Sequence, residues 1–370
     1  MELKKIHISD IGKVVTGKTP RTSVAENYGG DIPFLTPSDN LSHKSAPKTI
    51  KTLTKQGLNE VKNCLLPPQS VCVSCIGSDL GKVVMTVEPT VTNQQFNSIV
   101  PNENFNADFV YYLMSQVGKE LNYLSKTSTA VPIINKSSFS NYEVEVPSLK
   151  VQEKIASILA SLDSKIELNR RINDNLEQQA QALFKSWFVE NASYSGVSIS
   201  EYFLPNRGKN LLVSDAKGGI TPVVAGGLTP SAFHNVANTK APVITISASG
   251  ANAGFVNLWG IPVWAADSSY IDSTIVSNIY FWYNLLKYNQ KNIYESQTGS
   301  AQPHIYPKHI GNLLIPDLDM RKVECYESIV TSMYLQINEI QQETKFLSDL
   351  RDTLLPKLMS GELKINDLNC

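Results

Sequence analysis

Thr129-Ala-Val-Pro-Ile-Ile134 returns 171 residues later as Ser300-Ala-Gln-Pro-His-Ile305, and this repetition decides the fold. The match extends in both directions at nearly the same offset. The further matching pairs are Gly77 and Gly250, Gly81 and Gly254, Tyr112 and Tyr283, Tyr123 and Tyr294, Ile166 and Ile337, Leu176 and Leu347, and Leu183 and Leu354. Because the period is far longer than a solenoid unit, the sequence predicts one module present twice and a pseudo-twofold molecule.

Each copy begins with short apolar runs separated by turn residues, which predicts an α+β globule with a mixed sheet and helices. The runs that predict strands lie at 32–35, 71–76 and 83–85 in the first copy and at 222–224, 243–247 and 256–259 in the second. A helix is expected near the end of each globule, over 107–124 and over 279–291.

A long helix is expected after each globule. Apolar side chains recur at spacings of three and four from Val151 to Trp187 and again from Val323 to Leu358. This pattern is typical of a coiled coil, and about 36 helical residues would span roughly 55 Å. Asn169 falls in the first stripe at the position of Ile340 in the second. A buried amide there would set the register, and the alternative is that Asn169 faces solvent at a stutter.

The repeat divides the chain into two globules, 1–148 and 191–316, and two helical segments, 149–190 and 317–370. With 370 residues, of which 42% are hydrophobic, the chain can bury two cores, so disorder is excluded. No apolar run reaches the roughly 18 residues of a membrane span, and no secretion signal precedes the first globule. The five cysteines are odd in number and spread thinly, which favours a reducing compartment. We therefore expect a cytoplasmic protein.

The net charge of −1 argues against holding a polyanion by bulk charge. Local segregation weakens that argument, because residues 41–63 contain five lysines and one acid. Those lysines either face a nucleic acid or form a solvated surface. Residues 191–316 contain seven basic and five acidic side chains, so bulk charge gives the second globule no such partner.

Some segments match part of a catalytic motif but lack the residues or the structural context that the chemistry requires. Residues 12–19 fit the phosphate-loop pattern, but Pro20 follows at once where a helix is required. The Pro-Pro pair at 67–68 lacks the residues with which a DNA methyltransferase holds its target base. The five histidines show no metal-ligand spacing. Cys72 and Cys75 do not form a ligand pair either, because two positions three apart on a strand face opposite sides. No enzyme activity, cofactor or metal is expected in this chain.

A duplicated globule with a heptad helix after each copy resembles the specificity subunit of type I restriction-modification systems. The segments that carry the resemblance lie at the start and end of the first globule and in the two helices. They are 10–13, 16–20, 30–37, 127–135, 144–147, 152–169 and 354–362. The phosphate-loop match is then part of the motif with which the first globule begins.

This resemblance implies a non-catalytic subunit with two target recognition domains, each reading half of a split, asymmetric double-stranded DNA target. It implies that the two helices pack antiparallel as a spacer and dock two methylation subunits, which carry S-adenosylmethionine. Two restriction subunits would join with ATP and Mg. The alternative is a scaffold or decoy that docks methylation subunits through the coiled coil without reading DNA. A nucleotide-dependent enzyme would rest on residues 12–19 alone.

Polar loop side chains are the candidates for reading DNA, because base edges are recognised by hydrogen bonds. In the first globule the candidates are Thr36, Ser38, Asp39, Asn40, Lys44, Gln94, Gln95 and Asn97. In the second they are Thr229, Ser231, His234, Asn252, Ser268, Ser269 and Tyr270. An ordinary turn or capping role is the alternative for each. The helix positions expected to dock partners are Ile155, Ile158, Leu162, Ile166, Asn169, Leu176, Leu183, Ile337, Ile340, Leu347 and Leu354.

Overall fold

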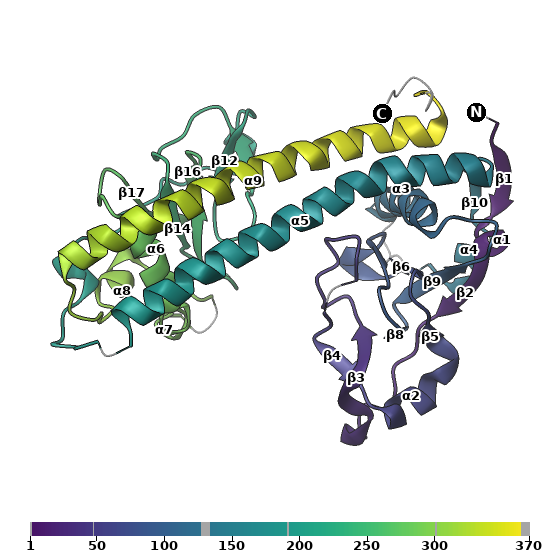
Figure 1. Cartoon of the computed structure of the whole chain (residues 1–370), viewed down its shortest axis with the longest axis horizontal. Coiled ribbons are helices and arrows are strands. Elements are labelled where there is room, and N and C mark those ends of the chain that lie inside the picture. The colour runs from purple at the N-terminus through teal and green to yellow at the C-terminus, as the bar shows by residue number, and fades with distance from the viewer. Residues whose placement is uncertain (1, 47, 127–133, 191, 300–301, 364–370) are drawn as a thin grey trace. The chain divides into compact units, whose positions relative to one another are not determined.

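The structure is a computed structural model that describes residues 2–46, 48–126, 134–190, 192–299 and 302–363 (Figure 1). It divides into two compact units. Unit 1 comprises Met1–Ile166 and Phe346–Cys370, and unit 2 comprises Glu167–Lys345. Each unit contains one globule and a part of both long helices. The repeated stretch with which the sequence argument began falls largely at 129–133 and 300–301, outside the described residues.

Unit 1 holds two four-stranded sheets, with the orders β2-β9-β6-β7 and β4-β3-β8-β5. The first is antiparallel throughout, whereas β3 and β8 of the second run parallel. Strands β1 and β10 pair separately. The strands are β1 (Lys4–His7), β2 (Gly12–Thr16), β3 (Tyr28–Leu35), β4 (Lys51–Leu53), β5 (Leu65–Leu66), β6 (Val71–Ser74), β7 (Val83–Met85), β8 (Thr90–Thr92), β9 (Phe96–Pro101) and β10 (Glu143–Val146). The three strands expected here are confirmed as β3, β6 and β7.

The β2-β9-β6-β7 sheet separates two apolar cores, because successive side chains of a strand point to opposite faces. On one face, Val73 and Ile99 pack with helix α3 (Ala107–Lys126) and with both long helices. On the other face, Cys72 packs with Leu35 of the second sheet. Cys75 belongs to the first core, so the two cysteines lie on opposite sides as expected. Burial raises the pKa of the Cys72 thiol to about 12, which leaves it protonated and inert.

Unit 2 repeats this topology with strand orders β11-β17-β14-β15 and β13-β12-β16. The first sheet is again antiparallel, and β12 and β16 are again parallel. The strands are β11 (Asn206–Arg207), β12 (Thr221–Val224), β13 (Ala232–His234), β14 (Val243–Ser247), β15 (Val256–Trp259), β16 (Trp264–Ala265) and β17 (Ser268–Asp272). The strands expected at 222–224, 243–247 and 256–259 are therefore confirmed.

Two glycines in each globule show that the repetition extends to the backbone. Gly77 and Gly81 have φ angles of 77° and 87°, and their counterparts Gly250 and Gly254 have 83° and 89°. This left-handed region favours glycine because other residues place a Cβ against the backbone there. The Gly81 amide donates to the Ser74 carbonyl at 2.8 Å, and the Gly254 amide makes the equivalent bond at 2.7 Å. The same turn therefore follows β6 and β14.

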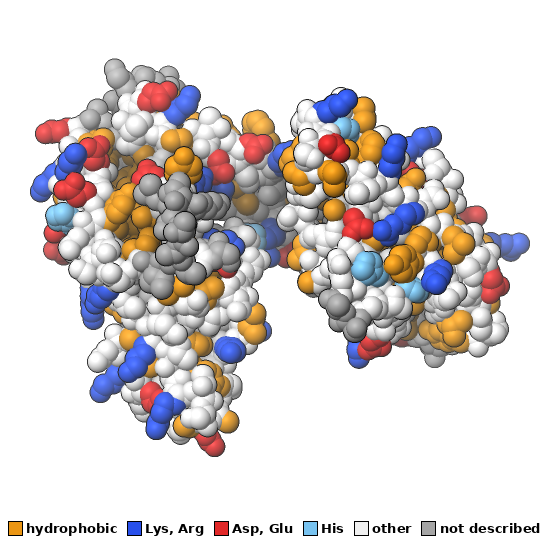
Figure 2. Space-filling view, turned by 180° about the vertical axis from the view of Figure 1, so that it is seen from behind, with side chains coloured by type: hydrophobic (Ala, Val, Ile, Leu, Met, Phe, Trp, Pro, Cys, Tyr) orange, Lys and Arg blue, Asp and Glu red, His pale blue; other side chains and the backbone are white. Residues whose placement is uncertain are grey.

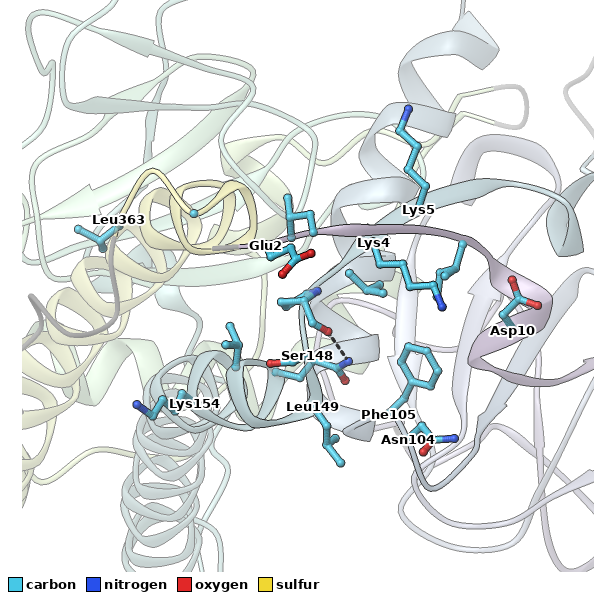
Figure 3. A pocket seen from close by; sticks show the side chains of 17 residues that line it. Glu2, Lys4, Lys5, Asp10, Asn104, Phe105, Ser148, Leu149, Lys154 and Leu363 are labelled. Carbon is cyan, nitrogen blue, oxygen red and sulfur yellow. Dashed lines mark hydrogen bonds between the residues drawn. The ribbon is translucent and has the colours of Figure 1, made fainter.

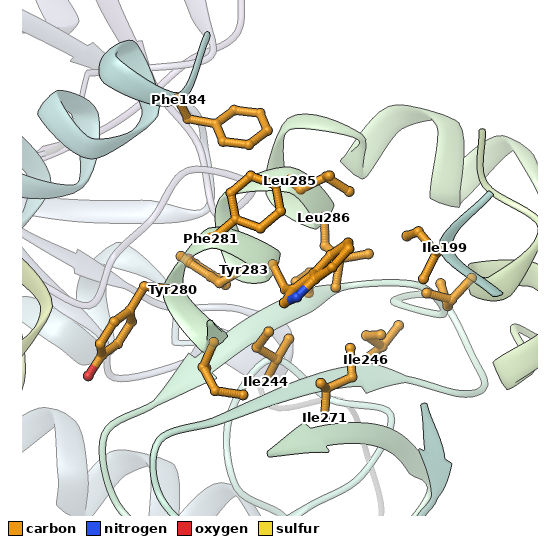
Figure 4. Close-up of a cluster of buried hydrophobic side chains, with 14 of the residues drawn as sticks. Phe184, Ile199, Ile244, Ile246, Ile271, Tyr280, Phe281, Tyr283, Leu285 and Leu286 are labelled. Atoms are coloured by element: carbon orange, nitrogen blue, oxygen red, sulfur yellow. The ribbon is translucent and has the colours of Figure 1, made fainter. Parts of the chain in front are cut away.

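Aromatic and β-branched side chains fill the core of unit 2 (Figure 4). Ile244 and Ile271 of the sheet face Phe281 of helix α6 (Ile279–Tyr288), and Phe184 of helix α5 (Leu149–Phe188) packs on Phe281 with ring centroids 5.7 Å apart. The single helix expected over 279–291 is wrong in one respect. Helix α6 ends at Tyr288, and the side-chain amide of the capping residue Asn289 donates back to the Leu285 carbonyl at 2.9 Å. A second helix, α7 (Gln290–Glu295), follows.

The two long helices are α5 (Leu149–Phe188) and α9 (Met320–Ser360), as the heptad pattern predicts. Within unit 2 they run antiparallel, because the Tyr326 hydroxyl donates to the Ala180 carbonyl while Asn169 contacts Glu343. The remaining short helices are α1 (Ile8–Ile11), α2 (Lys55–Val61), α4 (Lys136–Ser140) and α8 (Pro307–Gly311). Single 3₁₀ turns lie at Ala25–Asn27, Lys62–Cys64, Gly77–Asp79, Ile199–Glu201 and Val213–Asp215.

Asn169 is 1% exposed, so the alternative in which it faces solvent is wrong. Its side-chain amide donates to the Glu343 carboxylate at 2.7 Å and to the Thr344 hydroxyl at 3.3 Å. Its own carbonyl oxygen accepts no hydrogen bond from the described residues. A buried amide with one specific partner pair is suited to fixing the register of two helices, and that role stays a prediction.

The segment that imitates a phosphate loop is a strand. Gly12–Thr16 forms β2 and pairs with β9 along its whole length, and no helix begins directly after Thr19, since the next helical turn is the 3₁₀ turn at Ala25–Asn27. A phosphate loop instead needs free amides and a helix N-terminus. Across the described ranges, no helix is long and apolar enough to cross a membrane.

Candidate nucleic-acid interface

Several strands of the first globule end at a common edge. β3 and β8 are parallel and finish together, and the Asn93 amide donates to the Leu35 carbonyl at 3.0 Å. The end of β2 joins them, since the Gly17 amide donates to the Phe96 carbonyl at 3.1 Å. We call this edge the first polar edge. It comprises residues 17–19, 36–40, 76–79 and 93–97.

The second globule has an equivalent edge. The Ala266 amide donates to the Val224 carbonyl at 2.8 Å, and the Gly208 amide donates to the Ser268 carbonyl at 2.8 Å. We call this the second polar edge. It comprises residues 208–209, 225–231, 248–252 and 266–269. Each edge thus gathers loops from both sheets of its globule, so polar side chains distant in sequence can meet one ligand.

At the first polar edge, Ser38, Asn40 and Gln94 are exposed, and Thr36 and Gln95 are half-buried. Asp39 and Asn97 are buried. The Asp39 carboxylate accepts the amides of Thr36 and Ile50, both at 2.7 Å. The Asn97 amide donates to the Ile134 carbonyl at 3.0 Å, and its oxygen accepts the Thr16 hydroxyl at 2.6 Å. These two side chains hold the edge together, which is the alternative role considered for them.

Lys44 lies away from the first polar edge, because its carbonyl accepts the Met85 amide at 2.7 Å and Met85 pairs with Val71 at the opposite end of the sheet. Its ammonium pairs with Asp108 at 2.7 Å, donates to the Tyr112 hydroxyl at 3.3 Å and lies 4.8 Å from the centre of the Tyr112 ring. The Tyr112 hydroxyl in turn donates to Asp163 of α5 at 2.5 Å, and Arg351 of α9 pairs with Asp163 at 2.7 Å. Burial, and next the charge of Asp163, raise the pKa of Tyr112 well above its usual range. Lys44 therefore links the loop to both long helices.

At the second polar edge, Thr229 and Ser231 are exposed and Asn252 is half-buried. Ser268 and Ser269 are buried, and the Ser268 hydroxyl donates to the Val224 carbonyl at 3.3 Å. Ser269 Oγ is buried without a partner among the described residues.

His234 and Tyr270 do not belong to the second polar edge. His234 pairs with Thr221 at the opposite end of β12, and its Nδ1 accepts the Lys217 amide at 3.1 Å. Tyr270 is half-buried and pairs with Thr245, two residues inside the sheet. Charged side chains that sequence reasoning missed lie closer to the edge. Arg207 pairs with Asp267 at 2.7 Å, and Asp267 also accepts the Ser249 hydroxyl.

Lysine and arginine side chains are scattered singly over the face seen in Figure 2, with acidic side chains among them. Of the five lysines between 41 and 63, Lys44 pairs with Asp108, while Lys51 and Lys55 are exposed on the neighbouring elements β4 and α2. In the part of the chain that the structure describes, no three histidine, cysteine or acidic side chains gather as metal ligands. The exposed DNA-reading candidates at the two polar edges, Ser38, Asn40, Gln94, Thr229 and Ser231, are all uncharged.

The helix positions expected to dock partners point inward. Ile155, Asn169 and Ile337 are buried, and the other eight are half-buried. The exposed apolar side chains of the helices lie at other positions, such as Leu168, which is 50% exposed, and Leu335 in unit 2 and Phe346 in unit 1. A heptad pattern identifies the seam between two helices and carries no signal for an outer face.

A cavity of about 1300 Å³ lies beside the start of α5 in unit 1 (Figure 3). Its lining includes Lys4, Phe105 and Leu363, and the Gln152 side chain donates to the Pro147 carbonyl at 3.0 Å there. No DNA-reading candidate lines this cavity. The polar edges are therefore surface features, separate from this cavity.

Comparison with known proteins agrees with this architecture. Residues 1–178 match the family model described as the type I restriction modification DNA specificity domain. The MjaIX type I restriction enzyme specificity subunit of Methanocaldococcus jannaschii is 26% identical over 417 residues, covering 99% of this chain and 94% of the relative. The HindI specificity subunit of Haemophilus influenzae is 36% identical over 174 residues, covering 45% of this chain and 38% of the relative.

The crystal structure of a type I restriction-modification S subunit from M. genitalium has a similar fold. Its TM-score is 0.57 at 20% identity, and the match covers 97% of this chain and 96% of that one. The fold, the matched domain and the full-length relative agree. The first half of the chain thus matches the type I restriction modification DNA specificity domain, and nearly the whole chain is similar in sequence to a type I restriction enzyme specificity subunit.

Proposed function

We propose that this chain is the DNA-reading subunit of a type I restriction-modification complex, and that each polar edge reads one half of a split target. The observation that carries the proposal is the duplication of the edge. Both globules share the strand order of the first sheet, three matching strands of the second sheet and the same glycine turn, yet their loops carry different polar side chains. One scaffold with two sets of hydrogen-bonding groups suits an asymmetric target, because base edges are read by hydrogen bonds in the grooves.

Catalysis is assigned in this proposal to partners. Methylation subunits would supply S-adenosylmethionine, and restriction subunits would supply the ATP- and Mg-dependent step, as the family resemblance implies. The scattered charge supports this division, since a weakly charged DNA-reading subunit needs partners that contact the phosphates.

The exposed Leu335 side chain offers a partner an apolar contact, so L335E is expected to weaken association with a methylation subunit in a pull-down from co-expressing cells.

The first test removes exposed polar groups from one edge at a time. In cells that express the assembled complex, mapping of methylated adenines is expected to show relaxed sequence preference in one half of the motif for Ser38→Ala with Gln94→Ala. Thr229→Ala with Ser231→Ala should relax the other half. A lost base contact reduces discrimination by about 1–3 kcal/mol, or roughly 5- to 150-fold.

Gln178→Ala is the matched control, because Gln178 is an exposed glutamine on α5. It should leave both halves of the motif unchanged. An intact complex that methylates the same motif in all three variants would contradict reading by these side chains. A complex that assembles but protects no DNA in footprinting would contradict the proposed function and favour a scaffold.

The second test concerns the spacer. One heptad inserted after Ile166 in α5 and one after Lys345 in α9 leaves the contacts within each unit intact, because both insertions fall at the unit boundary. Seven helical residues add about 10 Å, so the gap between the half-sites is expected to grow by about three base pairs in the methylated motif. An unchanged gap with full methylation would contradict the spacer role.

A further inference from the structure

A glycine-lysine pair occupies the same place in both globules, although it escaped the repeat found in the sequence. Gly17-Lys18 follows β2, and Gly208-Lys209 follows β11. The Lys18 amide donates to the Thr92 carbonyl at 2.9 Å, and the Lys209 amide donates to the Ala265 carbonyl at 2.9 Å. Thr92 ends β8 and Ala265 ends β16, which are matching strands of the two globules. The two lysines are therefore structural equivalents.

Both glycines are required by the close passage of the chain over the neighbouring sheet. A Cβ on Gly17 would lie 2.1 Å from the Asn93 carbonyl oxygen, and one on Gly208 would lie 2.4 Å from that of Ala266. Contacts this short are forbidden, so neither position tolerates a side chain. The backbone of each lysine is thereby fixed at its polar edge, and in the second globule the Trp264 indole also donates to the Lys209 carbonyl at 2.8 Å.

The two side chains are free while their backbones are fixed. Lys18 and Lys209 are exposed, and neither ammonium forms an ion pair with a residue that the structure describes. Lys13 and Lys136 lie in the same region as Lys18, since all three positive charges act to lower the pKa of the Cys64 thiol, although burial raises it overall. Beside Lys18, the Thr19 hydroxyl donates to Gln94 at 2.6 Å.

A bound nucleotide is the wrong ligand for this site. A phosphate loop binds through free backbone amides, but the amides of Gly17 and Lys18 are both used within the globule. A flexible ammonium without an acidic partner at an exposed polar edge instead suits a phosphate of a nucleic-acid backbone, which it contacts as a point charge without reading sequence. In the second globule the nearby acid Asp267 does not oppose this, because Arg207 already pairs with it at 2.7 Å.

We propose that Lys18 and Lys209 each hold a backbone phosphate of the DNA, one for each half of the target. This inference rests on the proposed function and adds to it a pair of equivalent residues that position the globules on the duplex. It also accounts for the segment resembling a phosphate loop in the first globule: the glycine fits against the sheet, and the lysine contacts a phosphate of the DNA.

The test measures DNA binding by the assembled complex over a range of salt concentrations. Lys18→Gln and Lys209→Gln are each expected to weaken binding to cognate and to unrelated DNA equally, and to reduce the slope of log K against log salt by about 0.9. The double variant should reduce the slope by about 1.8. In footprinting, each single variant should weaken protection of one half-site only, and the methylated motif should stay the same.

Lys119→Gln and Lys240→Gln are the matched controls. Lys119 lies on α3 beside Glu120 and Asp352, and Lys240 precedes β14, whose far end reaches the second polar edge. Neither control should alter the slope. An unchanged slope in both test variants would overturn the lysine proposal while leaving the proposed function intact, and so would a changed motif at constant slope. A wild-type complex that binds no specific DNA would instead overturn the proposed function.

Discussion

Replacing Arg351 with methionine is expected to lower the free energy of unfolding of unit 1 by about 3 kcal/mol. The Asp163 side chain is 10% exposed, pairs with Arg351 at 2.7 Å and accepts the Tyr112 hydroxyl at 2.5 Å. Without the guanidinium, a buried carboxylate loses its counter-charge, and this is costly because water cannot replace it. Urea denaturation of the full chain, with hydrogen exchange of the α3 amides to isolate unit 1, measures the loss.

The triple variant Arg351→Met, Asp163→Leu and Tyr112→Phe is the control for this prediction. It removes the Asp163 carboxylate together with both of its partners, so most of the lost stability should return. Because Lys44 also contacts the Tyr112 hydroxyl, Arg351→Met should in addition loosen the loop at 36–44 and weaken protection of the first half-site. A loss below about 1 kcal/mol in the single variant would count against a buried ionic link.

Replacing Glu327 with alanine is expected to destabilise unit 2 by about 3 kcal/mol. The Glu327 carboxylate accepts the amides of Tyr280 and Phe281 at 3.1 and 2.7 Å, in the first turn of α6. Asn278, which precedes this helix, makes no side-chain capping bond, so a residue of α9 caps α6 from a distance. Its removal leaves two amides without an acceptor and takes a negative charge from a helix N-terminus. Hydrogen exchange of the α6 amides reports the loss.

The pH dependence of unit 2 gives a separate measure of the same carboxyl. Burial raises the pKa of Glu327 from its usual 4.5, and the two amide hydrogen bonds offset this only in part. A pKa that is higher in the folded state means that folding favours the protonated form. The resulting stabilisation is complete below the unfolded value and is lost as the pH rises through the folded one. Glu327→Gln should abolish this part of the pH profile, and an unaltered profile would refute the assignment.

The fold could be predicted from sequence because its determinants are local. Gly77 and Gly81 mark a turn that only glycine accommodates, and the same pair recurs before β15. The heptad spacing of α5 and α9 likewise depends on each helix alone. Asn169 shows the limit of such reasoning. Its burial and hydrogen bonding depend on Glu343 and Thr344 of the other helix, and the sequence pattern of α5 contains no information about them.

The candidate site was harder to predict, since the direction of a polar side chain depends on the neighbouring strand. Ser231 and Ser268 look alike in sequence, yet only Ser231 is exposed, whereas Ser268 lies beneath β12. The equivalence of Lys209 to Lys18 could not be predicted from the sequence, for another reason. The connection from Lys209 to β14 is shorter than that from Lys18 to β6, so the two lysines do not align at the offset shared by the strands. Tertiary hydrogen bonds were needed to match them.

The two units anchor their globules with different chemistry, and this difference bears on how a duplicated chain assembles. In both units a tyrosine hydroxyl donates to a carboxylate of α5, Tyr112 to Asp163 and Tyr283 to Glu177. In unit 1 that carboxylate also pairs with Arg351, whereas in unit 2 the rings of Tyr280 and Tyr334 stack nearby with centroids 4.7 Å apart. Twin modules in one polypeptide risk misassembly, in which a helix half packs on the wrong globule. An Asp163 carboxylate set against the tyrosines of unit 2 would be buried without its counter-charge. Divergence between the two copies thus favours packing of each part of the long helices on the globule of its own unit during folding.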